Sequence, residues 1–161
     1  MKSIVYILFA LHLIACQKDK ESTVPIVSGS EESLLNIPKG FPEMEFPIGN
    51  ELTKERWELG KKLFYEKRLA IDKSISCGSC HKAKLSFADD VALSPGVYNR
   101  PGVRNAPSLA NVGYHPYLLR EGSVPTLEMQ VLVPIQEHNE FNHNIVQIVE
   151  ELSQDSVYVM M

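Results

Sequence analysis

Two cysteines and a histidine stand close together in the middle of the chain, in the order Cys77-Gly78-Ser79-Cys80-His81. On one helical turn, residues spaced three and four apart lie on the same side, so both thiols and the imidazole can face one ligand. This C-x-x-C-H spacing is that of covalent c-type haem attachment. The cysteines would bond the two vinyl groups, and His81 would bind the iron as proximal ligand. Gly78 and Ser79 are small enough to let the porphyrin edge come close.

Other sites are compatible with parts of this motif. A structural zinc site needs about four ligands, and only Cys77, Cys80 and His81 are grouped. A thioredoxin-like C-x-x-C motif belongs in a βαβ context, which the hydrophobic pattern lacks. A disulfide between the two cysteines is the plainest alternative in an oxidising compartment. The export signal described next favours one covalent haem c over that disulfide.

The first 15 residues read as a targeting segment. Lys2 precedes an apolar run over residues 4–14, which has signal-peptide length and is too short for an ordinary membrane span. The run ends in Leu13-Ile14-Ala15-Cys16, which is typical of the bacterial lipobox, where the cysteine is acylated. An ordinary signal peptide with an incidental cysteine is the alternative. We predict a lipoprotein signal over 1–15, with lipid on Cys16 holding the chain on the periplasmic side of a bacterial membrane.

The rest of the chain reads as an all-α domain with long ordered loops. Residues 16–36 have no clear period and are predicted to be a flexible linker, whereas residues 37–161 form the domain. Residues 37–50 hold several prolines and are predicted to be ordered coil. Residues 84–117 are rich in Gly, Pro and Asn, and a loop of that length is usually functional or wrapped around something. Apolar spacing predicts helices over about 53–67, 76–82, 126–133 (stopping at Pro134) and 144–152.

Composition excludes some classes of partner. The chain has 161 residues, of which 44% are hydrophobic, and a formal net charge of -4 without a long run of one sign. Nucleic-acid binding would require a basic face, so we expect no nucleic-acid partner.

Several stretches, in the right order, resemble the N-terminal haem domain of bacterial di-haem cytochrome c peroxidases, whose relatives include the methylamine-utilisation di-haem enzymes. The resemblance runs from about residue 37 to 152 and implies a cytochrome c-like haem domain. The matching stretches are Leu59-Gly60-Lys61-Lys62-Leu63-Phe64-Tyr65, Ile75-Ser76 with the haem motif, Arg104-Asn105-Ala106-Pro107-Ser108-Leu109-Ala110-Asn111, Leu127-Glu128-Met129-Gln130, and Pro134-Ile135 with Glu140.

The resemblance implies roles for further residues. In that family a distal glutamate acts as acid and base in splitting hydrogen peroxide, with a glutamine nearby, and the matching positions are Glu140 and Gln130. A positioned carboxylate can take a proton from one peroxide oxygen and deliver it to the other. Without the resemblance, Glu140 reads as a surface glutamate. Asn105 matches a calcium ligand or is a turn asparagine, and Arg104 is a candidate haem contact.

The chain also departs from the family. Arg120 replaces the tryptophan between the two haems and is expected to pair with a haem propionate. Val97 takes the place of a distal histidine, so either the haem is open to peroxide or another residue caps it. His115, the one histidine in this loop region, reads as a turn residue. The chain ends at Met161 without a second C-x-x-C-H, and we expect a partial product of a longer gene.

Two functions follow as expectations. The first is a peroxidase that reduces hydrogen peroxide to water with electrons from a donor c-type cytochrome or cupredoxin, with the full-length form able to form a homodimer. The second is a mono-haem electron-transfer cytochrome without peroxidase activity, with Met129 as sixth iron ligand. Met129 also reads as a core methionine of its helix. An open or water-bound iron favours the peroxidase, and a histidine/methionine iron favours the carrier.

Overall fold

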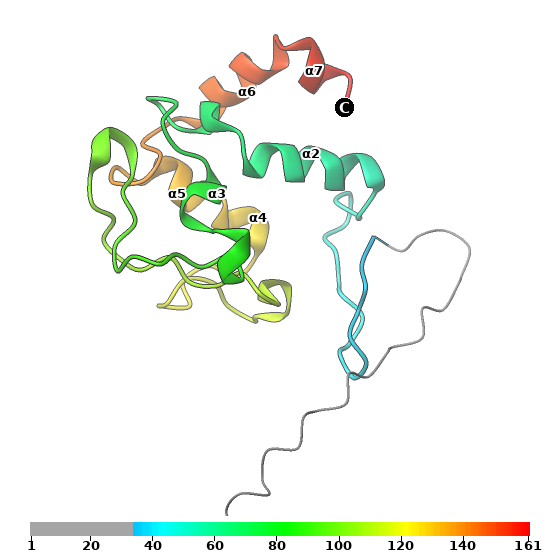
Figure 1. Ribbon diagram of the computed structural model, residues 1–161. Helices are drawn as coiled ribbons and strands as arrows, with labels where there is room; N and C mark the ends of the chain where they lie inside the picture. Colours follow the sequence, from blue (N-terminus) through cyan, green and yellow to red (C-terminus); the bar gives the residue numbers. More distant parts are fainter. Residues whose placement is uncertain (1–33) are drawn as a thin grey trace, which may run out of the picture. The chain divides into compact units, whose positions relative to one another are not determined.

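A computed structural model of the chain describes residues 34–161. The predicted signal peptide, Cys16 and most of the predicted linker lie outside these residues. The chain divides into two units, Met1–Glu32 and Ser33–Met161, and the second contains all the described elements (Figure 1). Its helices are, in chain order, α2 (Lys54–Phe64), the 3-10 helix η2 (Lys67–Leu69), α3 (Cys77–Cys80), the 3-10 helices η3 (Ala83–Leu85), η4 (Val97–Asn99) and η5 (Val112–Tyr114), α4 (Leu127–Gln130), α5 (Leu132–Gln136), α6 (Ile145–Ser153) and α7 (Ser156–Val159).

Extended pairing is scarce in this unit. Residues 34–161 contain three isolated antiparallel bridges, Lys82 with Ala88, Pro95 with Pro101, and Leu118 with Val124, and no longer strand. The expectation of a helical domain with little strand is therefore confirmed. Within the same residues, no helix is long and apolar enough to cross a membrane.

Helix α2 begins where the sequence predicts. The Thr53 hydroxyl accepts a hydrogen bond from the amide of Arg56 at 3.2 Å, which satisfies one of the free amides of the first turn. The helix ends at Phe64, so the predicted end near residue 67 is wrong. After Phe64 the chain forms the separate 3-10 helix η2, which begins where the Glu66 carboxylate accepts from the amide of Arg68 at 2.9 Å.

The helical segment after Thr126 differs from its prediction. It consists of two short helices, α4 and α5, joined at Val131, and it continues through Pro134 to Gln136. The predicted stop at Pro134 is wrong because this proline falls in the first turn of α5. An amide in a first turn has no partner within the helix, so proline removes no hydrogen bond there.

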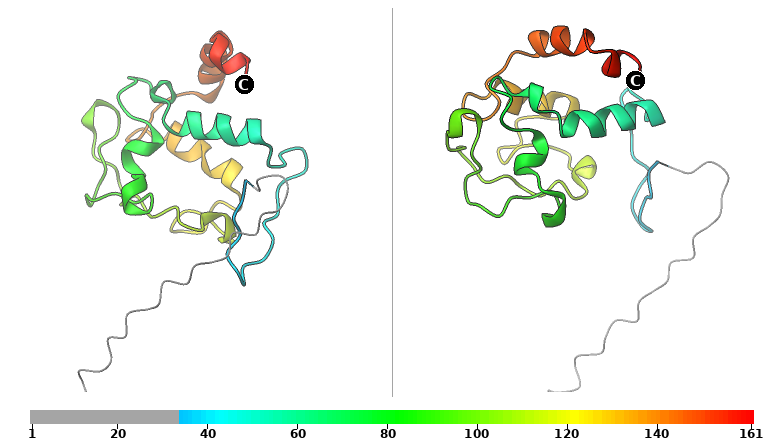
Figure 2. Two further views of the ribbon diagram at one scale, coloured as in Figure 1. Left: turned by 45° about the vertical axis from the view of Figure 1, so that its right-hand side comes forward. Right: turned by 45° about the horizontal axis from the view of Figure 1, so that its top comes forward.

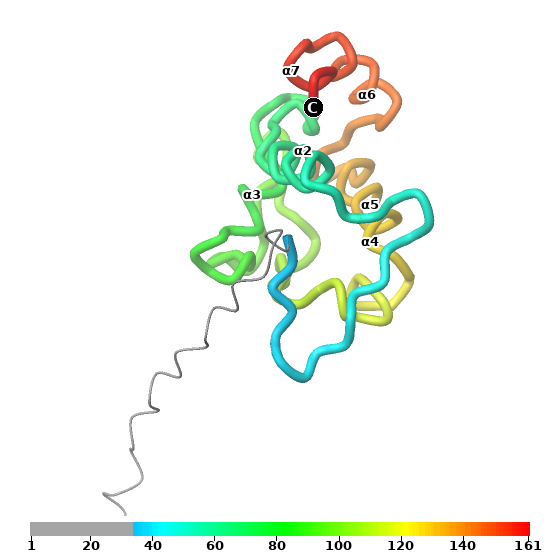
Figure 3. The backbone as a smooth tube through the Cα atoms, turned by 90° about the vertical axis from the view of Figure 1, so that its right-hand side faces the viewer, coloured from blue at the N-terminus to red at the C-terminus, as the bar shows by residue number. Residues whose placement is uncertain are grey.

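The last two helices pack beside the end of α2 and η2 (Figures 1 and 3). Helix α6 matches the prediction over 144–152, and Asn144 caps it. Helix α7 was not predicted, although Asp155 caps it by accepting from the amide of Val157 at 2.9 Å. Asp155 also accepts from the guanidinium of Arg68 at 3.0 Å, which ties this end of the chain to η2.

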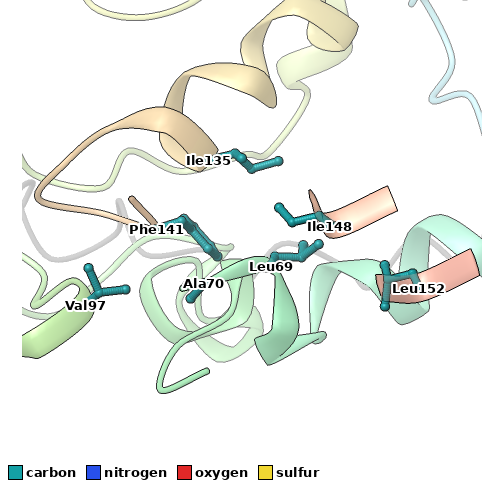
Figure 4. Close-up of a cluster of buried hydrophobic side chains, with 7 residues drawn as sticks. All are labelled: Leu69, Ala70, Val97, Ile135, Phe141, Ile148 and Leu152. Carbon is teal, nitrogen blue, oxygen red and sulfur yellow. The ribbon is translucent and has the colours of Figure 1, made fainter. Parts of the chain in front are cut away.

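A small hydrophobic core joins these segments (Figure 4). Its buried side chains come from η2 and the residue after it, from η4, from α5 and the loop after it, and from α6. They are Leu69, Ala70, Val97, Ile135, Phe141, Ile148 and Leu152. Since Val97 is completely buried among them, the loop that carries it is fixed to the core rather than free.

The segment from α3 to α4 contains no helix longer than a 3-10 turn. Figure 2 shows it, green to yellow, running around one side of the domain. Backbone hydrogen bonds within the segment hold it, such as that from the amide of Gly102 to the carbonyl of Ser94 at 2.9 Å, beside the bridge of Pro95 with Pro101. The coil over residues 37–50 is helix-free, as predicted, and the ring of Phe41 meets that of Tyr114 edge to face at 5.1 Å.

Candidate haem site

Helix α3 places the two cysteines one turn apart. The hydroxyl of Ser79 accepts a hydrogen bond from the amide of Ser76 at 3.0 Å, which closes the start of the turn. Cys77 and Cys80 are both half-buried free thiols, so the disulfide alternative is not supported. Among residues 34–161 no group of three or more histidine, cysteine or acidic side chains could hold a metal ion, which speaks equally against a zinc site.

Burial keeps both thiols neutral. Burial raises the pKa of the Cys77 thiol to about 11, and the carboxylate of Glu140 adds to that rise. The pKa of Cys80 is also raised, first by burial and then by the negative charges of Asp89 and Glu140. The charge of Glu140 therefore acts on both thiols.

The imidazole of His81 is oriented by its own turn. Its Nδ1 lies 2.8 Å from the carbonyl oxygen of Phe87. A carbonyl oxygen can only accept, so Nδ1 carries the hydrogen, and in the neutral ring Nε2 is then the nitrogen with the free lone pair. A metal-binding histidine usually donates its other ring N–H to an oxygen in this way, which fixes the orientation of the ring. In this orientation Nε2 of a neutral His81 would be available to a metal ion.

The small residues of the motif have local structural roles. A Cβ at Gly78 would lie 2.6 Å from the ring of Tyr65 and 3.5 Å from that of Phe64, so a larger residue would require the Tyr65 ring to move. Phe64 in turn meets the ring of Phe87 edge to face at 5.9 Å. The close approach of the Tyr65 ring is therefore one reason for a glycine at position 78, beside the expected approach of a porphyrin edge.

Glu140 is a half-buried carboxyl held by its backbone. Burial raises its pKa, and the nearby charge of Glu137 raises it further. The amide of Glu140 donates to the carbonyl of Glu137 at 3.0 Å, and the amide of Val97 donates to the carbonyl of Glu140 at 2.9 Å. A Cβ at Gly96 would overlap the carbonyl oxygen of Asn139, so this loop can approach Glu140 only with glycine there.

Gln130 is the last residue of α4, and its side-chain oxygen lacks a hydrogen-bond partner among the described residues. This oxygen is also buried. Leaving a buried amide oxygen unpaired costs about 1–3 kcal/mol, so such an atom usually marks a place for a ligand or water. Met129, its neighbour, is 52% exposed, so its interpretation as a core methionine is wrong.

The other predicted residues lie at the surface of the loop segment. Arg104 forms an ion pair with Glu121, and Arg120 is exposed. The side-chain amide of Asn105 donates to the carbonyl of Val91 at 3.1 Å, and its side-chain oxygen accepts no hydrogen bond within residues 34–161. The side chain of Val97 points into the core, and His115 is exposed directly after η5.

Sequence reasoning missed the buried groups that support these residues. Asp89 accepts from Ser94 at 2.5 Å and pairs with Lys82 at 2.6 Å, next to the attachment motif. Two adjacent acidic residues in a loop are ordinarily interpreted as a solvated turn, so the sequence did not indicate that Asp89 is buried. Gly96, between Pro95 and Val97, reads as an ordinary turn glycine.

Taken together, the described residues fit a covalently attached haem. Two free thiols on one turn are matched by an imidazole whose Nε2 is available. A buried oxygen of Gln130 lacks a partner, and a desolvated carboxyl, Glu140, acts electrostatically on both thiols. Haem bonded at the motif would use Cys77 and Cys80 for its vinyl groups and His81 for its iron.

Comparison with known proteins agrees with this fit. Residues 54–161 match the family described as di-haem cytochrome c peroxidase. The chain is 33% identical over 126 residues to the methylamine utilization protein MauG of Methylorubrum extorquens, covering 76% of this chain and 36% of the relative. It is also 33% identical over 115 residues to the cytochrome c551 peroxidase of Pseudomonas aeruginosa, covering 71% of this chain and 32% of that protein.

A solved structure is similar as well. The crystal structure of a MauG-like protein associated with microbial copper homeostasis superposes with a TM-score of 0.71 at 33% identity, covering 78% of this chain and 37% of that one. The chain thus spans about a third of the length of the relatives that it matches. The family match over 54–161, on a fold and motif of the right kind, shows that the chain belongs to the di-haem cytochrome c peroxidase family.

Proposed function

We propose that this domain holds a peroxidatic haem c, attached through Cys77 and Cys80 and bound at the iron by His81. The observation that carries the proposal is the half-buried Glu140, a carboxyl with a raised pKa whose charge acts on both attachment thiols. Perturbed carboxyls beside a cofactor site are frequent acid/base groups. The net reaction would reduce hydrogen peroxide, with two electrons and two protons, to two molecules of water.

Glu140 would move the proton. As a carboxylate it would accept a proton from the peroxide oxygen nearer the cofactor and deliver it to the far oxygen, which then leaves as water. Gln130, through its unpaired buried oxygen, would accept a hydrogen bond from the peroxide and hold it in line. The haem, when bound, would supply the redox chemistry, with electrons from a donor c-type cytochrome or cupredoxin.

We also propose that the peroxide side of the haem is open. Val97 stands where many family members have a distal histidine, and its side chain is fully buried in the hydrophobic core. A backbone hydrogen bond ties this residue to Glu140, so the loop has a fixed position. Because its side chain is buried in the core, Val97 would not cap the iron.

The remaining assignments complete the proposal. Residues 1–15 would direct export, Cys16 would carry lipid on the periplasmic side of the membrane, and residues 16–36 would link it to the domain over 37–161. Arg120 would pair with a haem propionate and Arg104 would contact the haem once released from Glu121. Asn105 would contribute its free side-chain oxygen to a calcium ion. In the full-length form we expect a second haem domain and a homodimer.

The carrier alternative would require Met129 as sixth ligand. Met129 is more than half exposed, whereas the buried, unpaired side-chain oxygen on α4 among the described residues belongs to its neighbour Gln130. This arrangement favours the peroxidase.

The test is to produce the mature chain with c-type maturation machinery and to record the ferric absorption spectrum. Haem that stays with the denatured protein, and is lost in Cys77→Ala, would support attachment. A high-spin spectrum that changes promptly on adding peroxide supports the peroxidase. A low-spin spectrum with a methionine–iron band, abolished by Met129→Leu and indifferent to peroxide, would establish the carrier instead.

A further inference from the structure

We propose that Asp89 is a positioning residue for His81, acting through Lys82 and Ser94 on the turn whose carbonyl orients the imidazole. The inference rests on the proposed haem attachment at the motif but not on any role of Glu140. It gives a function to a buried acidic side chain that the peroxide chemistry does not use.

The turn after the haem motif is a strained loop closed at its base. The amide of Lys82 donates to the carbonyl of Ala88 at 3.0 Å, and the amide of Phe87 donates to the carbonyl of Lys82 at 2.9 Å. Ser86 and Phe87 both have positive φ values, 54° and 61°. Two successive non-glycine residues in the left-handed region are uncommon, and such backbone persists only where its surroundings hold it.

The orienting group is part of this strained loop. The carbonyl of Phe87 is the acceptor for Nδ1 of His81 at 2.8 Å. If the turn relaxes, Phe87 leaves its left-handed conformation and its carbonyl rotates away from the imidazole. The geometry of the histidine therefore depends on whatever holds the loop closed.

Asp89 is the buried part of the clamp that closes the loop. Its carboxylate is only 1% exposed and lies 2.6 Å from the ammonium of Lys82. It also accepts from the hydroxyl of the buried Ser94 at 2.5 Å, and the carbonyl of Ser94 accepts from the amide of Gly102 further along the chain. A carboxylate with so little solvent contact has few alternative geometries, so it fixes Lys82 strongly.

A second contact supports the same loop from outside. The hydroxyl of Ser108 donates to the carbonyl of Ser86 at 2.6 Å. The strained residues are thus held from both sides, by Ser108 at the tip and by Asp89 at the base.

Asp90 provides a matched control. It has the same side chain, is adjacent in sequence, and its carboxylate also contacts the ammonium of Lys82, at 2.5 Å. It differs in being 57% exposed and in lacking any bond to Ser94. Asp89→Asn and Asp90→Asn therefore remove the same charge from the same lysine, but only the first weakens the buried clamp.

The experiment uses the haem-loaded chain and two readouts besides activity. The first is the midpoint potential of the haem. The second is the rate at which the Nδ1 proton of His81 exchanges with deuterium, followed by NMR. Asp89→Asn should exchange this proton at least tenfold faster and should raise the potential, because a weaker hydrogen bond makes the imidazole a poorer donor to ferric iron. Asp90→Asn should leave both close to wild type.

Ser94→Ala separates positioning from charge, because it removes one hydroxyl and no charge. It should speed the exchange in the same direction as Asp89→Asn, and it decides the question if Asp89→Asn does not fold. Equal exchange rates in wild type, Ser94→Ala and Asp89→Asn would overturn the inference. Absence of covalent haem from the wild-type chain would instead defeat the proposed function, so the two failures are distinct.

Discussion

The backbone amide of Val97 donates a hydrogen bond to the carbonyl oxygen of Glu140 at 2.9 Å, across 43 positions of sequence (140 minus 97). Val97 is itself buried in the core, and Gly96 beside it allows the close approach. The backbone of the proposed acid/base residue is therefore held in place by the hydrophobic core, through the loop that carries Gly96 and Val97.

Glu140→Gln should slow the reaction of the haem with hydrogen peroxide by about 100- to 10 000-fold, the range typical of losing a general acid/base group. Glutamine keeps the size and the hydrogen-bonding oxygen but cannot accept the proton. Stopped-flow absorbance after mixing with peroxide measures the rate. Glu137→Gln is the matched control and should react at nearly the wild-type rate at neutral pH. Similar rates in wild type and Glu140→Gln would remove Glu140 from the mechanism.

The rate of the peroxide reaction should fall in acid, and the pH of that fall should lie above the usual pKa range of a glutamate. The base form of Glu140 must be ionised, and both burial and the charge of Glu137 raise its pKa above 4.5. The rate should therefore rise with pH through that raised pKa. Glu137→Gln removes the neighbouring charge, lowers the pKa of Glu140 and moves the acid limb to lower pH. A limb that stays in place in this variant would show that another group titrates.

Gly96→Ala should abolish most of the peroxide reaction without loss of covalent haem. The new Cβ would overlap the Asn139 carbonyl oxygen, so the backbone that carries Glu140 must shift. A displacement of about 1 Å can cost about 100-fold in rate. Gly60→Ala is the control, since nothing lies within 4 Å of a Cβ there, and it should stabilise α2 by about 0.5–1 kcal/mol. A fully active Gly96→Ala protein would contradict the role of this loop.

Acid should destabilise the domain through Glu66. The guanidinium of Arg68 and the hydroxyl of Tyr158, at 2.6 Å, help to lower the pKa of Glu66 from 4.5 to about 2. A lowered folded-state pKa means that the stabilisation is complete above pH 4.5 and is lost as the pH falls from 4.5 towards 2. Glu66→Gln should reduce the free energy of unfolding by about 1–3 kcal/mol at pH 7 and flatten this dependence.

Chemical denaturation at several pH values measures this effect. Glu58→Gln, on the exposed side of α2, is a suitable control because no ion pair involves Glu58 among the described residues. An unchanged slope of stability against pH in Glu66→Gln would assign the acid sensitivity elsewhere.

The sequence by itself determined the features that depend on local chemistry. Cys77, Cys80 and His81 lie on one turn because their spacing matches the helical period, and Thr53 and Asn144 cap helices because their side chains reach amides two or three residues away. The helical class with little strand also follows from hydrophobic periodicity. The resemblance to the di-haem cytochrome c peroxidase family could be detected from short motifs in order.

Only the tertiary structure decided which residues support the site. The clamp of Asp89 with Ser94 and Lys82 joins residues whose separation in sequence has no regular period, and burial alone makes it rigid. The approach of Gly96 to Asn139, and the raised pKa of Glu140, depend on how a loop packs against the core. Packing between distant segments has no counterpart in local sequence pattern, because the free energy that fixes it comes from contacts formed only after the chain has folded.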